Sequence, residues 1–187
     1  MATNAVSICN SALVKIGAER IVALSDNTPA AIACNEQFAK VRDEVLRAHP
    51  WNCVISRVEL SSVADYEDPM EEWAYKFSLP SDCLRVLRTK DDVDHKIEGR
   101  YLLAQDSSCV IQYIKQETDY TKYDAMLLET LSTRLAVDLS YAITQSKVVA
   151  EMLMAQYQRL LSEARSVDAQ EGTPEDTVIT DWIQTRI

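Results

Sequence analysis

The sequence predicts an α+β protein that is mainly helical: a helix bundle with a small antiparallel β-sheet lobe and an extended C-terminal tail. Near both ends of the chain, apolar residues recur at three- and four-residue spacings, which is typical of one helix face. Between them, over about 51–117, turn residues separate short alternating segments, a pattern that favours antiparallel strands. The helical spacing ends near Ser166. We therefore expect a helical domain over 1–167 that contains the inserted β lobe, and a docking tail over 168–187.

Two helices are expected before the lobe. The first, over about 4–16, is followed by Gly17, which suits the left-handed position after a helix. The second starts with Thr28 as N-cap and Pro29 at its first position. It ends before Pro50, because proline disfavours helical geometry in the preceding residue. The apolar positions of this second helix are Cys34, Phe38, Val41 and Val45.

The middle of the chain is expected to form the sheet. The stretch WNCVISRVEL (51–60) is rich in β-branched residues. It leads into an acidic loop that has six Asp or Glu residues from Glu59 to Glu72 and no basic residue. Further short segments follow, namely EWAYKFSL, CLRVLRTK, HKIEG, RYLLAQ and SCVIQYIKQ. Their lengths and the turn residues between them predict a small antiparallel sheet.

Two long helices are expected after the lobe, over about 123–144 and 147–165. The apolar stripe of the first is Leu127, Leu128, Leu131, Leu135, Leu139 and Ala142. Ser146 suits the N-cap of the second. The apolar positions of that helix are Val149, Leu153, Tyr157, Leu160 and Ala164. Because only a short turn separates the two helices, we expect antiparallel packing. The side chains expected inside the pair are Leu131, Leu135, Leu153 and Leu160.

The composition excludes several classes of function. A net charge of −10 argues against a protein that binds DNA or a membrane surface, because such proteins concentrate Lys and Arg. The chain has only three glycines, far apart, so no glycine cluster can cradle a phosphate. No apolar run approaches the ~20 residues that a membrane span needs. The first residues lack the basic leader of a signal peptide. We expect neither a membrane span nor a signal peptide.

The residue types that carry catalysis form no recognisable set. The five cysteines include no Cys-x-x-Cys pair, so we interpret them as buried thiols of a reduced protein assembled inside a cell. His49 and His95 are isolated, and their spacing to the cysteines matches no zinc site. No serine lies in a G-x-S-x-G turn. We therefore predict no catalytic residue, no metal and no cofactor, and expect that the protein is not an enzyme.

His49, Pro50 and Trp51 pose a choice between a functional histidine and a structural corner. His49 follows the last turn of a helix, near the negative end of the helix dipole, where an imidazole is electrostatically favoured. Pro50 ends that helix, and Trp51 offers a large apolar surface where helix gives way to strand. We interpret the three residues as a corner that plugs the core.

The C-terminal tail contains an apolar segment that cannot fold a core by itself. Trp182 and Ile183 stand near the end of an acidic stretch, although a purely solvated tail would not need them. Trp and Arg are the residue types most enriched at interface hot spots, and Trp182 and Arg186 are four residues apart. We predict that Asp181, Trp182, Ile183 and Arg186 form a docking surface for a neighbouring subunit or another protein.

Six segments, spread in order along nearly the whole chain, together carry a resemblance to a known family. They are CNSALVKIGAERIVALSDNTPAA (9–31), RDEVLRAHPWN (42–52), YKFSLPSDCLRVLR (75–88), EGRYLLAQ (98–105), RLAVDLSYAIT (134–144) and DWIQTR (181–186). Together they resemble the tail tubular protein A, or head-to-tail adaptor, family of short-tailed bacteriophages. Cys53 departs from the pattern, because such proteins often carry Phe after the Trp-Asn pair. The departure suggests a locally smaller core.

The resemblance implies a structural virion protein, assembled in the host cytoplasm and located in the tail connector. Such adaptors form a twelve-subunit ring that joins the portal protein to the tail nozzle protein and lines the DNA conduit. An acidic lumen would let DNA pass without specific binding, because cationic contacts would hold its phosphates. The alternative is a helical regulatory or chaperone-like protein that binds one partner through its C-terminal tail.

Overall fold

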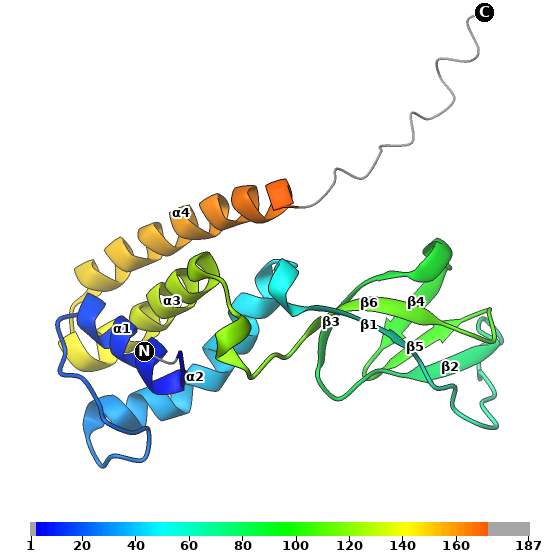
Figure 1. Ribbon diagram of the computed structural model, residues 1–187. Coiled ribbons are helices and arrows are strands. Elements are labelled where there is room, and N and C mark those ends of the chain that lie inside the picture. The colour runs from blue at the N-terminus through cyan, green and yellow to red at the C-terminus, as the bar shows by residue number, and fades with distance from the viewer. Residues whose placement is uncertain (1–2, 172–187) are drawn as a thin grey trace, which may run out of the picture.

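The computed structural model describes residues 3–171, in which helices from both ends of the chain lie together and the β lobe extends from one end of this bundle (Figure 1). The bundle consists of α1 (Ala5–Lys15), α2 (Pro29–Ala48), α3 (Ala125–Thr144) and α4 (Lys147–Glu171). The strands of the lobe are β1 (Ile55–Glu59), β2 (Tyr75–Ser78), β3 (Cys83–Thr89), β4 (His95–Glu98), β5 (Tyr101–Ala104) and β6 (Val110–Lys115). The predicted α+β class is confirmed.

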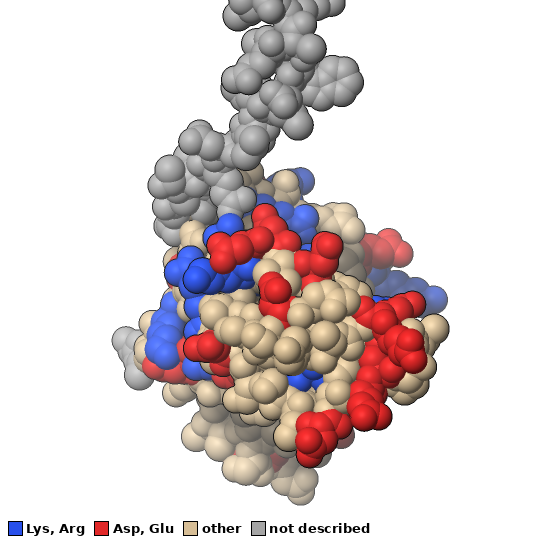
Figure 2. All heavy atoms as spheres, turned by 90° about the vertical axis from the view of Figure 1, so that its right-hand side faces the viewer, with Lys and Arg blue, Asp and Glu red and all other residues tan. Residues whose placement is uncertain are grey.

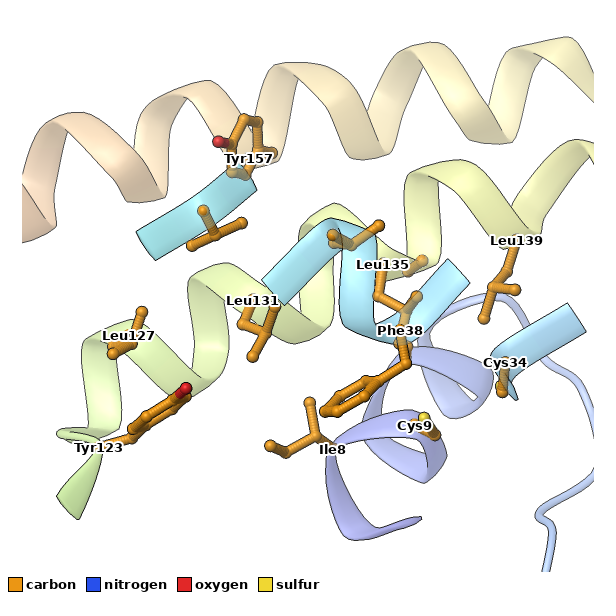
Figure 3. Packing of buried hydrophobic residues seen from close by; sticks show 14 of the residues in the cluster. Ile8, Cys9, Cys34, Phe38, Tyr123, Leu127, Leu131, Leu135, Leu139 and Tyr157 are labelled. Carbon is orange, nitrogen blue, oxygen red and sulfur yellow. The ribbon is translucent and has the colours of Figure 1, made fainter. Parts of the chain in front are cut away.

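Helix α3 lies at the centre of the bundle, because it packs against α1, α2 and α4. Its buried apolar residues are Leu127, Leu131, Leu135, Ala136 and Leu139. Figure 3 shows the ring of Phe38 from α2 between Ile8 of α1 and the leucines of α3. Helix α4 runs back along α3 in the opposite direction, as expected from the short turn between them (Figure 1).

The helix ends follow local capping chemistry. Asn4 and Ser7 form a reciprocal capping box at α1, with the Asn4 side chain accepting from the Ser7 N–H at 2.8 Å. Thr28 caps α2 as predicted, accepting from the Ala31 N–H, with Pro29 at the first position. Gly17, at φ 71°, takes the left-handed conformation expected after α1.

Three expectations for the last two helices are corrected. Ala142 is exposed and Leu160 is only partly buried, so neither lies in the core between the helices. Helix α4 continues to Glu171, so the tail cannot begin at residue 168. The final turns of α4 lack the apolar period but consist largely of good helix formers, which continue a helix without marking a face. The remaining tail, 172–187, lies outside the described residues.

The lobe has two three-stranded antiparallel sheets where one was expected. The first sheet has the strand order β1-β6-β3, and the second has the order β2-β5-β4. The chain crosses between them four times, because it leaves the first sheet for β2 and again for the β4-β5 hairpin, and returns to it at β3 and at β6. Turn residues mark where strands end but do not say which strands pair, so sequence patterns could not separate the sheets.

The two sheets enclose a small core of their own. Phe77, Leu102 and Ala104 from the second sheet meet Ile111 and Tyr113 from the first, and each is at most 5% exposed. Because side chains alternate along a strand, each sheet also has a side that faces away from this core.

Candidate functional site

The corner at Trp51 joins the bundle to the lobe. Trp51 is 1% exposed and belongs to the core of the bundle. Its indole Nε1 donates a hydrogen bond of 3.0 Å to the carbonyl of Val45 in the last turns of α2. That carbonyl lies near the end of the helix, where backbone oxygens need a partner from outside the helical ladder. The predicted burial of Trp51 is confirmed.

His49 takes part in the same corner. Its ring stands edge-on to Trp51, with ring centroids 5.0 Å apart and an interplanar angle of 87°. The neighbouring carbonyl of Ala48 accepts a hydrogen bond of 3.1 Å from Arg165 of α4. Arg47 donates to the carbonyl of Leu84 in β3. Helix α2 therefore ends in contacts to α4 on one side and to the lobe on the other.

A polar network holds the segment that returns from the lobe to the bundle. Arg42 and Asp43 of α2 form an ion pair at 2.7 Å, although Arg42 is only 8% exposed. Gln116, which follows β6, donates from Nε2 to the carboxylate of Asp43 at 2.7 Å. Burial acts to lower the pKa of the Arg42 guanidinium, but its hydrogen bonds to Asp43 and Tyr120 leave that pKa raised. The Arg42 guanidinium therefore stays charged although it is buried.

Glu117 extends this network by one residue. Its carboxylate is 10% exposed and accepts from Lys122 Nζ at 2.8 Å and from the backbone N–H of Asp119 at 3.0 Å. These two hydrogen bonds, the first being the stronger cause, lower the pKa of Glu117. The hydroxyl of buried Tyr123 donates to the Glu117 carbonyl at 2.6 Å. The segment between β6 and α3 is thus held by hydrogen bonds within itself and by the hydrogen bond from Gln116 to α2.

Sequence patterns missed this network for a physical reason. Gln116 and Asp43 are 73 residues apart in the chain. Each is an ordinary polar residue in its own segment, and only the fold brings them together. The corner residues were recognisable because Pro50 and Trp51 act locally, on the helix end that contains them. The corner at Trp51 could therefore be predicted from the sequence, whereas the hydrogen bond between Asp43 and Gln116 became visible only in the structure.

The outward side of the first sheet carries a row of basic side chains. Gln112 of β6 pairs in register with Arg57 of β1 and with Arg88 of β3. Arg88 Nε donates to the Gln112 amide oxygen at 2.8 Å, and Arg57 is exposed beside them. A pocket of about 370 Å³ lies here, and Lys90 is part of its lining. We refer to Arg57, Arg85, Arg88, Lys90 and Gln112 as the arginine face.

The outward side of the second sheet is covered by residues 61–73, which we refer to as the acidic loop. The Val63 N–H donates to the carbonyl of Lys76 in β2 at 2.7 Å. Lys76 Nζ lies 5.2 Å from the ring centroid of Tyr66 in the loop. The Asp68 carboxylate accepts from the backbone N–H groups of Met70, Glu72 and Trp73, and the first of these bonds contributes most to lowering its pKa. The loop is therefore folded onto the sheet.

The charges at this end of the molecule are segregated. Figure 2 shows acidic side chains in a band along one edge and basic side chains gathered mainly on the opposite flank. The acidic loop contains five Asp or Glu residues and no Lys or Arg. Its exposed carboxylates belong to Asp65, Glu67, Glu71 and Glu72.

The remaining candidate residues are scattered. His95 lies on exposed β4, far along the chain from His49, and its Nδ1 is 2.9 Å from the carbonyl of Val93. Cys9 and Cys34 lie together in the bundle core, where a mutual hydrogen bond and burial raise the pKa of Cys9. Within residues 3–171, no group of three or more His, Cys, Asp or Glu could hold a metal ion, and no helix is long and apolar enough to cross a membrane.

The predicted docking residues Asp181, Trp182, Ile183 and Arg186 lie outside the described residues, so their role stays a prediction. Comparison with known proteins finds no family model and no curated protein that matches the chain.

Proposed function

We propose that the chain is a head-to-tail adaptor of a short-tailed bacteriophage: a structural virion protein that joins the portal to the tail nozzle. The observation that carries the proposal is the ordered set of six segments. One of them, RDEVLRAHPWN, covers the last turns of α2 and the corner at Trp51. Another, YKFSLPSDCLRVLR, covers β2 and β3 of the two sheets. The resemblance thus includes the parts that join bundle and lobe.

The junction gives the subunit a property that a ring needs. In a closed ring, every interface repeats the same rotation, so each subunit must hold its two contact regions at a constant angle. Here, Trp51 locks the outgoing segment to α2, and the Asp43–Gln116 hydrogen bond locks the returning segment to the same helix. Two tethers on one helix restrict rotation of the lobe more than a single linker would.

The proposed partners follow from this assignment. The chain would assemble with itself, as a ring of twelve, and with the portal and nozzle proteins. The net charge of −10 supports a conduit through which DNA passes without specific binding, because an acidic surface repels phosphates. The protein would be assembled in the host cytoplasm and located in the tail connector of the virion.

The test is to mix the full chain with the purified portal protein and measure the mass of the product by light scattering after size exclusion. We expect a complex with twelve copies of the chain per portal ring. A matched variant ending at Glu171 removes the predicted docking segment but keeps α4 intact. It should stay folded and bind the portal more weakly, and Trp182→Ala should cause much of the same loss, on the order of 2–4 kcal/mol.

Two results would contradict different parts of the proposal. A full-length chain that stays monomeric with the portal excludes the adaptor function. If that monomer instead binds one soluble host protein through its tail, the regulatory or chaperone-like alternative is supported. If the variant ending at Glu171 binds the portal as well as the full chain does, the adaptor assignment survives but the docking tail is wrong.

A further inference from the structure

The arginine face is unusual for a protein this acidic. Three arginines, at 57, 85 and 88, are exposed on one side of a three-stranded sheet. Arg57 and Arg88 flank the same residue, Gln112, because β1 and β3 pair with opposite edges of β6. The adjacent pocket is also lined by Lys90, Asp91 and Asp92, so basic groups outnumber acidic ones there. Planar guanidinium groups are suited to bind carboxylates.

The acidic loop lies on the other side of the same lobe. Ile111 and Tyr113 of the first sheet and Phe77 and Leu102 of the second face each other across the core of the lobe. Gln112 and Arg57 point away from that core on the first sheet. Lys76, which contacts Tyr66 of the acidic loop, points away from it on the second. The two surfaces of opposite charge are thus separated by the thickness of two sheets and cannot meet within one molecule.

Two oppositely charged surfaces on opposite sides of the lobe favour one kind of contact between copies of the chain. In a two-fold dimer built on only one of these surfaces, that surface meets its own copy, which would bring arginine to arginine or carboxylate to carboxylate. In a head-to-tail contact one surface meets the other, so a pair of copies keeps one free arginine face and one free acidic loop for the next neighbours. Complementary charge therefore favours the head-to-tail contact, which closes into a ring when the rotation allows.

We propose that the arginine face of one copy binds the acidic loop of a second copy, with Arg57, Arg88 and Lys90 receiving the exposed carboxylates of Asp65, Glu67, Glu71 and Glu72. The contact deepens the proposed function, because an adaptor ring supplies the neighbour, and it rests on that function for the ring itself. The loop is a suitable ligand because Asp68 ties its backbone together at Glu72 and Trp73, and Tyr66 contacts Lys76 of its own sheet. Little ordering entropy is then lost on binding.

The experiment uses charge reversal in the full chain. Arg57→Glu and Glu67→Lys each place like charges at the contact, whereas the two together restore an opposite pair. Both residues are exposed, so their substitution leaves the core intact. Arg159→Glu and Glu163→Lys, at exposed positions of α4, make the same changes of charge away from both surfaces and serve as matched controls. Thermal melting checks that all variants are folded.

Self-association is measured by analytical ultracentrifugation, first on the chain alone at low salt and then on the chain with the portal. We expect each single reversal to weaken self-association on the order of tenfold, and the double variant to recover most of it. Association should also weaken as salt rises toward about 0.5 M, because exposed charges are screened. The control variants should associate as the wild type does.

Several results would overturn the inference. The first is that the single variants self-associate as strongly as the wild type. The second is that the double variant self-associates no more strongly than either single variant. A third is a wild-type chain that remains monomeric both alone and with the portal. If Arg57→Glu abolishes DNA binding in a gel shift while self-association is unchanged, the arginine face binds nucleic acid instead. Normal portal binding together with unaffected single variants rejects this contact alone. A charge-dependent self-association without portal binding rejects only the proposed function.

Discussion

The bundle and the lobe differ in how they use their apolar and charged residues. The core of the bundle contains 24 buried apolar residues, including Trp51 from the junction, whereas the core of the lobe contains eight. Conversely, the lobe carries the two charged surfaces and four of the five non-glycine residues with positive φ among the described residues. The comparison indicates that the bundle supplies most of the stability, while the lobe presents surfaces that are free to recognise a partner.

Because of this division, we expect substitutions in the two regions to have different effects on folding and on assembly. A change in the bundle core should alter folding first and assembly only as a consequence. A change on an outward side of the lobe should leave the fold intact and alter assembly alone. The junction lies between these cases, because it belongs to the bundle core but sets the position of the lobe.

The largest effect is expected at Leu135, which is fully buried at the centre of α3. Leu135→Asp should prevent folding, because an unpaired charge in the core costs more than the ~2–5 kcal/mol of a large-to-small cavity. The measurement is the yield of soluble protein and its circular dichroism. Met152→Asp, at a position 60% exposed on α4, is the matched control and should fold. A well-folded Leu135→Asp variant would contradict the assignment of the bundle core.

Trp51 should rank next. Trp51→Ala should lower the free energy of unfolding by ~3–5 kcal/mol, because a large buried aromatic is lost. Trp51→Phe keeps most of the apolar volume but removes the hydrogen bond to Val45, so its loss should be nearer 1–2 kcal/mol. Urea denaturation of both variants measures the difference. Equal stability of Trp51→Ala and the wild type would show that the corner does not hold the bundle and lobe together.

His49 should have a smaller effect. His49→Ala removes the edge-on contact with Trp51, which is worth about 0.5–1.5 kcal/mol for an aromatic pair. The free energy of unfolding from urea titration should fall by this amount, and portal binding of the folded variant should be retained. A chemical turnover that is lost in a folded His49→Ala protein would instead show that His49 is catalytic.

The smallest effect is expected from acid titration of the junction. The folded protein lowers the pKa of Glu117 below its ordinary value of about 4.3. Its contribution to stability is therefore complete above that value and is lost as the pH falls through the lower, folded-state pKa. Glu117→Gln should be less stable than the wild type at pH 7, and the gap should narrow below about pH 4. A constant gap over the titration would show that Glu117 is not held ionised by Lys122 and the backbone.

Local signals in the sequence were enough to predict much of the fold. Thr28, Pro29 and Pro50 define α2 through backbone chemistry that acts within a few residues, and Ser146 caps α4 as expected, at 3.4 Å from the Val149 N–H. The corner at Trp51 could be predicted for the same reason. The prediction of the leucine stripe of α3 was largely correct, because a 3.6-residue period directly reflects one buried helix face.

Long-range features could not be predicted in this way. The split into two sheets depends on which strands pair, and the arginine face exists only because Arg57, Arg88 and Gln112 come together from three strands. Leu160 fits the period of α4 but lies where the neighbouring helix covers it only partly. Pairing and coverage are properties of the assembled fold, so a single segment does not contain them.

We propose that a stable bundle holds the lobe so that neighbouring copies meet head to tail in a ring on the portal. Cryo-electron microscopy of the full chain mixed with its portal protein tests it most directly. We expect a twelvefold ring on the portal in which the arginine face of each subunit touches the acidic loop of the next. A portal without added density, or a ring in which the lobes do not touch, would contradict it.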